Sequence, residues 1–128
     1  MQLKHLNLAT SDVAGLASFF ERFFAFRRLA TRGQDAFALM CNQEDFVLAL
    51  MKAKKRDPAT YPEAFHVGFY VDAPDAVQAK HDELSAAGLS PGKVQDVSRG
   101  GGRVTTFYCT APGGVVVEIA TPPGLADE

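Results

Sequence analysis

The chain has 128 residues, which is enough for about one domain. Its 47% hydrophobic and 22% charged residues are typical of a globular protein and exclude a disordered or collagen-like chain. The 13 basic and 15 acidic residues give a net charge of −2, so the positive field that attracts nucleic-acid phosphates is missing. We therefore expect no nucleic-acid partner.

Cysteine usage and the lack of long apolar runs predict the compartment. The two cysteines, Cys41 and Cys109, form neither a CxxC pair nor a zinc-ribbon spacing. No apolar run has the length of a signal peptide or of a membrane span, which needs about 20 residues. We expect a reduced, cytoplasmic protein with no membrane partner.

The first half of the chain predicts a strand, a helix and three further strands. Residues 3–9 alternate between apolar and polar side chains, as a strand does. Thr10, Ser11 and Asp12 supply N-cap chemistry for a helix that continues to about residue 25 with apolar residues at helical spacing. Extended runs separated by turn-forming residues then follow at 26–32, 35–41 and 45–51.

The second half repeats this order, and His66 aligns with His5. The predicted elements are a strand at 65–71, a helix at 74–87 between Asp72 and Gly88, and strands at 89–97, 103–110 and 114–121. An internal duplication explains the match. We predict an α+β fold, a single domain over residues 1–128 built of two βαβββ modules (about 1–52 and 64–122) joined by a linker at 53–63. With the helices on one face of a mixed sheet, the other face is left to form a concave surface.

In three of the predicted strands, alternation places one side chain that can bind a metal on the face away from the helices. These side chains are His5, His66 and Glu118. Two neutral imidazoles and one carboxylate form a facial triad for iron(II), manganese or zinc. The alternative is that each is a hydrogen-bonded histidine or an isolated strand carboxylate. Because the histidines occupy equivalent positions of the repeat and share their face with the glutamate, we predict a metal site.

Three segments resemble the vicinal-oxygen-chelate superfamily: HLNLATSDVAGLASFF, HVGFYVDAPDAV and FYCTAPGGVVVEIATP. This superfamily includes glyoxalase I, bleomycin-resistance proteins, extradiol dioxygenases and fosfomycin-resistance thiol transferases. The resemblance covers nearly the whole chain. It implies a cupped mixed sheet with helices outside, a homodimer, and a divalent ion (Fe, Mn, Zn or Ni) at His5, His66 and Glu118. The phenylalanine-rich stripe on the first helix is compatible with a dimer interface or with extra core.

Departures from the family pattern narrow the reaction. Overlaying the last strands of the two halves matches Glu118 with Ala49, where glyoxalase I-like enzymes carry a second carboxylate for metal binding and proton transfer. Ala49 can do neither, so lactoylglutathione lyase activity is not expected. Extradiol dioxygenases of this superfamily use an additional acid–base histidine near the metal. The chain has no such residue to spare, because its remaining histidine, His81, lies on the second predicted helix, where we expect it in solvent.

Fosfomycin transferases resemble the chain in the three ligands and in a tyrosine at the position of Tyr108. Their phosphonate substrate needs several cationic or hydroxyl donors. The glycine-rich segment at 97–105 offers Arg99 and Arg103, whereas the tail after Glu118 has no basic residue.

Together these observations predict a metal-dependent enzyme of the glyoxalase/dioxygenase type that chelates a small oxygen-rich substrate through two oxygens. The predicted catalytic residues are Glu118 and Tyr108, and the predicted substrate contacts are Arg103, Tyr70 and Asn7. The alternatives are a non-catalytic antibiotic-binding protein of the bleomycin-resistance type and a fosfomycin-type thiol transferase.

Overall fold

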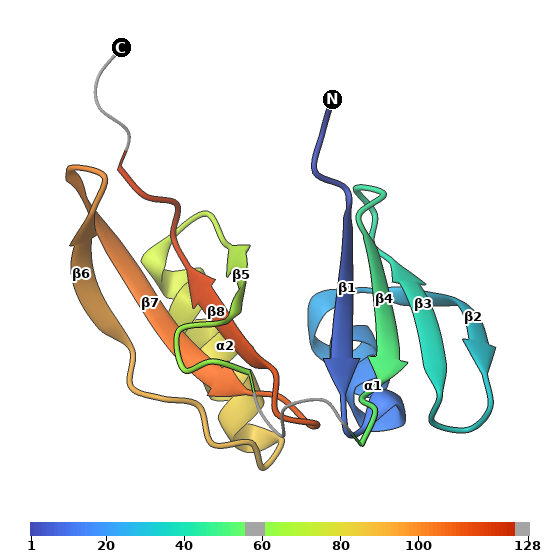
Figure 1. Cartoon of the computed structure of the whole chain (residues 1–128). Coiled ribbons are helices and arrows are strands. Elements are labelled where there is room, and N and C mark those ends of the chain that lie inside the picture. The colour runs from blue at the N-terminus through green and yellow to red at the C-terminus, as the bar shows by residue number, and fades with distance from the viewer. Residues whose placement is uncertain (56–60, 125–128) are drawn as a thin grey trace. The chain divides into compact units, whose positions relative to one another are not determined.

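Figure 1 shows the computed structural model of the chain, which describes residues 1–55 and 61–124. Within these residues the first module consists of β1 (His5–Thr10), α1 (Val13–Phe24), β2 (Arg27–Arg32), β3 (Phe37–Cys41) and β4 (Val47–Lys52). The second consists of β5 (Val67–Tyr70), α2 (Pro74–Ala86), β6 (Gln95–Arg99), β7 (Gly102–Thr110) and β8 (Val116–Ala120). The predicted α+β class and the two βαβββ modules are confirmed.

Each module forms its own four-stranded mixed sheet, in the orders β1-β4-β3-β2 and β5-β8-β7-β6. In both, the first strand pairs in parallel with the last, and the other pairings are antiparallel. Asn7 lies opposite Ala49 in the first sheet, as Gly68 lies opposite Glu118 in the second. The duplication seen in the sequence therefore extends to the strand register, and Ala49 is the structural equivalent of Glu118.

Helix α1 begins where the sequence predicts, because the Asp12 side chain accepts a hydrogen bond from the Gly15 backbone N–H at 2.8 Å. A Cβ on residue 15 would overlap the Asp12 carboxylate in its present position, so glycine allows this close approach of the cap. Three phenylalanines of the stripe are buried, and the Phe19 ring lies 5.6 Å from that of Phe20 and 5.5 Å from that of Phe23. Their burial favours the core interpretation of the stripe over the interface interpretation.

Helix α2 and the strand after it differ from the prediction in their bounds. Ala73, not Asp72, is the N-cap residue, and Pro74 begins the helix, where its missing N–H costs nothing. Strand β6 begins at Gln95 rather than near residue 89. Pro91 has no N–H to donate, and the Gly92 N–H donates to the Tyr108 carbonyl at 2.7 Å outside a regular ladder.

Contacts divide the chain into two compact units: Met1–Tyr61 with Ala111–Gly114, and Pro62–Thr110 with Val115–Glu128. Residues 111–114, which the sequence assigned to the second module, group with the first unit. Each has its own sheet and helix and is described by itself, so the single-domain organisation stays a prediction. Residues 56–60 of the predicted linker lie outside the described residues. Neither described helix combines the length and the apolarity that crossing a bilayer requires.

Candidate functional site

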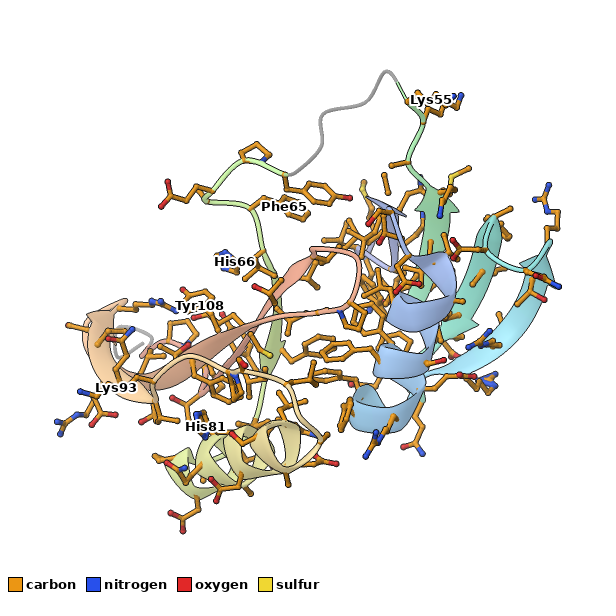
Figure 2. The ribbon with its side chains drawn as sticks, turned by 90° about the horizontal axis from the view of Figure 1, so that it is seen from below. Lys55, Phe65, His66, His81, Lys93 and Tyr108 are labelled. Carbon is orange, nitrogen blue, oxygen red and sulfur yellow. The ribbon has the colours of Figure 1, made fainter. Side chains whose placement is uncertain are left out.

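The second sheet carries most of the predicted site residues on the face that α2 leaves open. Glu118 of β8 lies opposite Tyr108 of β7. His66 directly precedes β5, and Arg99 ends β6. Figure 2 shows His66 and Tyr108 on one side of this sheet, whereas His81 of α2 lies on the other.

Glu118 is the centre of this group, and its side chain is almost fully buried. The residue is 6% exposed. Its Oε1 lies 3.2 Å from Nε2 of His66. Its Oε2 accepts hydrogen bonds from the Thr106 hydroxyl and from Nη1 of Arg99, both at 2.6 Å. Each oxygen of the carboxylate therefore has its own set of partners.

The environment keeps Glu118 ionised. Burial alone raises the pKa of Glu118, but hydrogen bonds from Thr106, Arg99 and Tyr108 and the positive charge of Arg99 outweigh it, so the pKa is lowered from its ordinary value. The same contacts, first with Glu118 and then with Tyr108, raise the pKa of Arg99. The pair is thus a carboxylate and a guanidinium at neutral pH.

The ring of His66 is oriented by two neighbours. Its Nδ1 lies 3.1 Å from the Ala64 carbonyl oxygen, and its ring meets the Tyr108 ring edge-on at 5.2 Å. Because a carbonyl oxygen can only accept, this contact assigns the ring proton to Nδ1. In the neutral ring, the lone pair of Nε2 then faces Glu118 Oε1, and two acceptors at this distance require a proton or a cation between them.

This donor set fits a divalent metal ion. An imidazole whose other nitrogen donates to a carbonyl is the usual arrangement of a metal-binding histidine. Nitrogen and oxygen ligands about 2.0–2.2 Å from a metal lie roughly 3.0–3.4 Å from each other, which matches the 3.2 Å between His66 Nε2 and Glu118 Oε1. Among the described residues, no three metal-binding side chains converge. The third predicted ligand, His5, lies in the first unit.

In the first unit, His5 and Asn7 are exposed on β1 and share its face away from the buried Leu8. The Asn7 side-chain amide donates to the Met51 sulfur at 3.2 Å. Ala49, opposite Asn7, places a methyl group where the second unit has Glu118. The first sheet therefore contributes a histidine and an amide, and no carboxylate at this position.

The two remaining predicted substrate contacts, Tyr70 and Arg103, lie on opposite faces of the second sheet. Tyr70 shares the Glu118 face of the second sheet by strand alternation and is 66% exposed. Arg103 lies on the opposite face, with its Nε 3.4 Å from Oδ2 of Asp96. The other oxygen of this carboxylate, Oδ1, accepts from the Thr105 hydroxyl. The structure therefore does not bring Arg103 together with Glu118.

The site contains two residues that were not among the predicted site residues: Arg99 and Thr106. Gly100 and Gly101 have φ of 58° and 79° and form a two-residue hairpin turn. This turn sets Arg99 opposite Gly102 and leaves Arg103 on the other face. Reading the glycines as a tight turn would have selected Arg99, and the two-residue spacing from Tyr108 would have selected Thr106.

Comparisons with known proteins concern the fold and the superfamily of the chain. Residues 2–119 match the model of the Glyoxalase/Bleomycin resistance protein/Dioxygenase superfamily. A solved structure described as a possible glyoxalase from Bacillus cereus is 35% identical, with a TM-score of 0.80 and coverage of 93% of this chain and 97% of that one. No functionally curated protein matches the sequence.

Two more distant structures share the fold alone. A lactoylglutathione lyase from Agrobacterium tumefaciens is 16% identical, with a TM-score of 0.70 and coverage of 94% of this chain and 92% of that one. A mutant of the fosfomycin resistance protein FosX from Listeria monocytogenes, solved with Mn(II) and 1S,2S-dihydroxypropylphosphonic acid, is 14% identical, with a TM-score of 0.68 and coverage of 92% and 87%.

Proposed function

Because the chain belongs to the glyoxalase/bleomycin resistance protein/dioxygenase superfamily, we propose that it is a metal-dependent enzyme acting on a small oxygen-rich substrate. His5, His66 and Glu118 would hold a divalent ion, one of Fe, Mn, Zn or Ni. When bound, such an ion polarises two neighbouring substrate oxygens and stabilises negative charge on them. The observation that carries the proposal is the pairing of His66 Nε2 with Glu118 Oε1 at 3.2 Å.

Tyr108 is the proposed proton donor at this site. Its hydroxyl oxygen accepts a hydrogen bond from Nη2 of Arg99 at 3.1 Å. Because the Arg99 guanidinium can only donate, it leaves the phenolic hydrogen to the acceptors at the site: Glu118 in the free protein, and a substrate oxygen when one is bound. Glu118 holds the metal and is also close to this hydroxyl across the β7–β8 pair. The two residues predicted as catalytic therefore act at one place.

The remaining site residues have binding roles in this proposal. Tyr70 presents an exposed ring on the Glu118 face, and Asn7 presents an amide on the face of β1 that carries His5. Arg103 is left out because it faces away from Glu118. Ala49 offers no second base, so the proposal does not include isomerisation by proton transfer between adjacent carbons.

A second candidate function is a metal-free ligand-binding protein of the bleomycin-resistance type. One observation favours it: Arg99 already places a positive charge on Glu118 at 2.6 Å. In this case the open face would hold its ligand by contacts alone. The two candidates differ in their need for metal.

Metal analysis of tag-free protein tests the choice. We expect about one Fe, Mn, Zn or Ni ion per chain after loading and dialysis, and we expect His66→Ala to lose it because a ligand is removed. The matched control is His81→Gln, since His81 packs against Phe107 on the other side of the sheet. Protein that binds none of these ions under any loading condition refutes the enzyme proposal and supports the ligand-binding protein.

Family membership also supports a homodimer and a cytoplasmic location for the proposed enzyme. Size-exclusion chromatography with light scattering tests the first, and the expected mass is that of two chains. A single-chain mass at every concentration would contradict it. Fractionation of the native cells tests the second, with the protein expected in the cytoplasmic fraction.

A further inference from the structure

The two oxygens of Glu118 are used differently. Oε2 has two short contacts, from the Thr106 hydroxyl and from Arg99 Nη1, both at 2.6 Å. Oε1 faces His66 Nε2 at 3.2 Å. One oxygen is thus turned toward the proposed metal ligand, while the other carries a permanent cation.

The position of Arg99 is fixed at both ends. Its guanidinium also donates to the Tyr108 hydroxyl at 3.1 Å, so it cannot leave Glu118 without losing a second hydrogen bond. Its backbone ends β6 opposite Gly102, where a Cβ would lie 2.5 Å from the Cα of Gly124. The hairpin end is therefore packed closely against another backbone segment. The Arg99 side chain is 39% exposed, compared with 79% for Arg103 of the same hairpin.

We propose that Arg99 is an internal cation that competes with the divalent metal for Glu118 and so weakens metal binding at this site. This inference rests on the proposed function. Arg99 and Glu118 together carry no net charge, so an arriving metal ion gains little attraction from the carboxylate. In addition, two cations on the two oxygens of one carboxylate lie about 5–6 Å apart, and a single and a double charge at that distance repel enough to lower affinity about tenfold even at the dielectric constant of water.

Arg99 is accordingly a positioning residue that also lowers the affinity of the site for the metal. It holds Glu118 Oε2, together with Thr106, and leaves Oε1 as the oxygen directed at His66. The site is then built for a metal that binds through one carboxylate oxygen. Removing the guanidinium charge should tighten metal binding, which is the opposite of what removing a metal ligand does.

Isothermal titration with MnCl₂ at low ionic strength, on the metal-free protein of residues 1–128, tests this competition. Arg99→Met removes the charge and keeps most of the side-chain length, and Arg99→Gln removes the charge but can still donate a hydrogen bond to Glu118. We expect both variants to bind Mn(II) about tenfold more tightly, or more, than the unmodified protein. The second variant keeps the test decisive if the first fails to fold, as judged by circular dichroism.

Arg103→Met is the matched control, since it removes the same charge from the same hairpin on the face away from Glu118. Its Mn(II) affinity should stay within about twofold of the unmodified protein, because an exposed, distant charge is screened. Unchanged or weaker binding by both Arg99 variants overturns the inference. An equal gain in Arg103→Met overturns it too, because the effect would then come from net charge.

The same titrations separate this inference from the proposed function. If the unmodified protein binds no Mn(II) but the Arg99 variants do, the competition is supported and manganese is excluded as the ion of the proposed enzyme. If the unmodified protein binds and the Arg99 variants bind no better, the enzyme proposal stands and the competition is refuted. If no form of the protein binds Mn(II), the competition is refuted, and the loading experiments with Fe, Zn and Ni decide the enzyme proposal.

Discussion

The hydrogen bond from Thr106 to Glu118 yields a quantitative prediction for stability. Thr106 is fully buried, and its hydroxyl donates to Glu118 Oε2 at 2.6 Å. Thr106→Val keeps the shape of the side chain but removes this donor. The Glu118 carboxylate then loses one of its partners, and its burial at 6% exposure limits replacement by solvent.

The expected loss follows from the charge of the acceptor. A hydrogen bond to a charged group contributes about 1.5–3 kcal/mol to stability. Unfolding entropies of about 2.1 cal/mol/K per residue, in a chain of 128 residues, convert this to a fall in Tm of about 6–11 °C. The neighbouring substitution Thr105→Val is the matched control. It removes a donor to Asp96, whose side chain is 45% exposed, so water can take over and the loss should be under about 1 kcal/mol.

Urea unfolding at neutral pH, followed by circular dichroism with a metal chelator present, measures both variants. The chelator removes any contribution of bound metal to stability. If Thr106→Val loses no more stability than Thr105→Val, the reasoning from the buried carboxylate is refuted. Thr106→Ser should recover most of the loss, because it restores the donor at the cost of one buried methyl group.

Two further predictions concern the first unit. The Asp35 carboxylate pairs with Lys52 and accepts from the Ala14 N–H, and its pKa is lowered chiefly by the Lys52 hydrogen bond, so Asp35→Asn should be less stable than the unmodified protein at pH 7. Urea titrations between pH 7 and pH 2.5 should show this difference in unfolding free energy vanish as the pH falls through the ordinary aspartate range and below. The reason is that a carboxylate with a lowered pKa in the folded state stabilises the fold only while it is ionised. A difference that persists at pH 2.5 contradicts the pairing. The Tyr61 hydroxyl donates to the Ala9 carbonyl at 2.7 Å and accepts from its N–H at 2.8 Å, so Tyr61→Phe should speed hydrogen exchange of the Ala9 amide, measured by NMR, by about fivefold or more. Unchanged exchange at Ala9 would show that the hydroxyl does not protect it.

Local chemistry made the secondary structure predictable. The Asp12 cap, the helical spacing of phenylalanines after it and the glycine after α2 each act within a few residues, so the helices were placed to within a few residues of their ends. The strand bounds were less accurate near Pro91, because a strand ends where its ladder hydrogen bonds end, and those depend on a partner far along the chain. The duplication was visible because both modules keep the same order of elements.

The site was only partly visible in the sequence. His66 and Glu118 were selected together because strand alternation places both on one face, and the structure brings them to 3.2 Å. The sequence predicted Arg103 as a substrate contact, whereas Arg99 is the arginine that the structure brings to Glu118, because the direction of each side chain depends on the number of residues in the hairpin turn between them. One residue more or less in this turn would move each arginine to the opposite face of the sheet.

The sequence by itself determined the two βαβββ modules, the equivalence of His5 with His66 and of Ala49 with Glu118, and the family of the chain, since each depends on periodicity, caps and order along the chain. The tertiary structure alone decided that Arg99 and Thr106 share one oxygen of Glu118 and that the other oxygen meets His66. Hydrogen bonds and charge pairs of this kind act over about 3 Å between separate strands, and only the register of the folded sheet sets those distances.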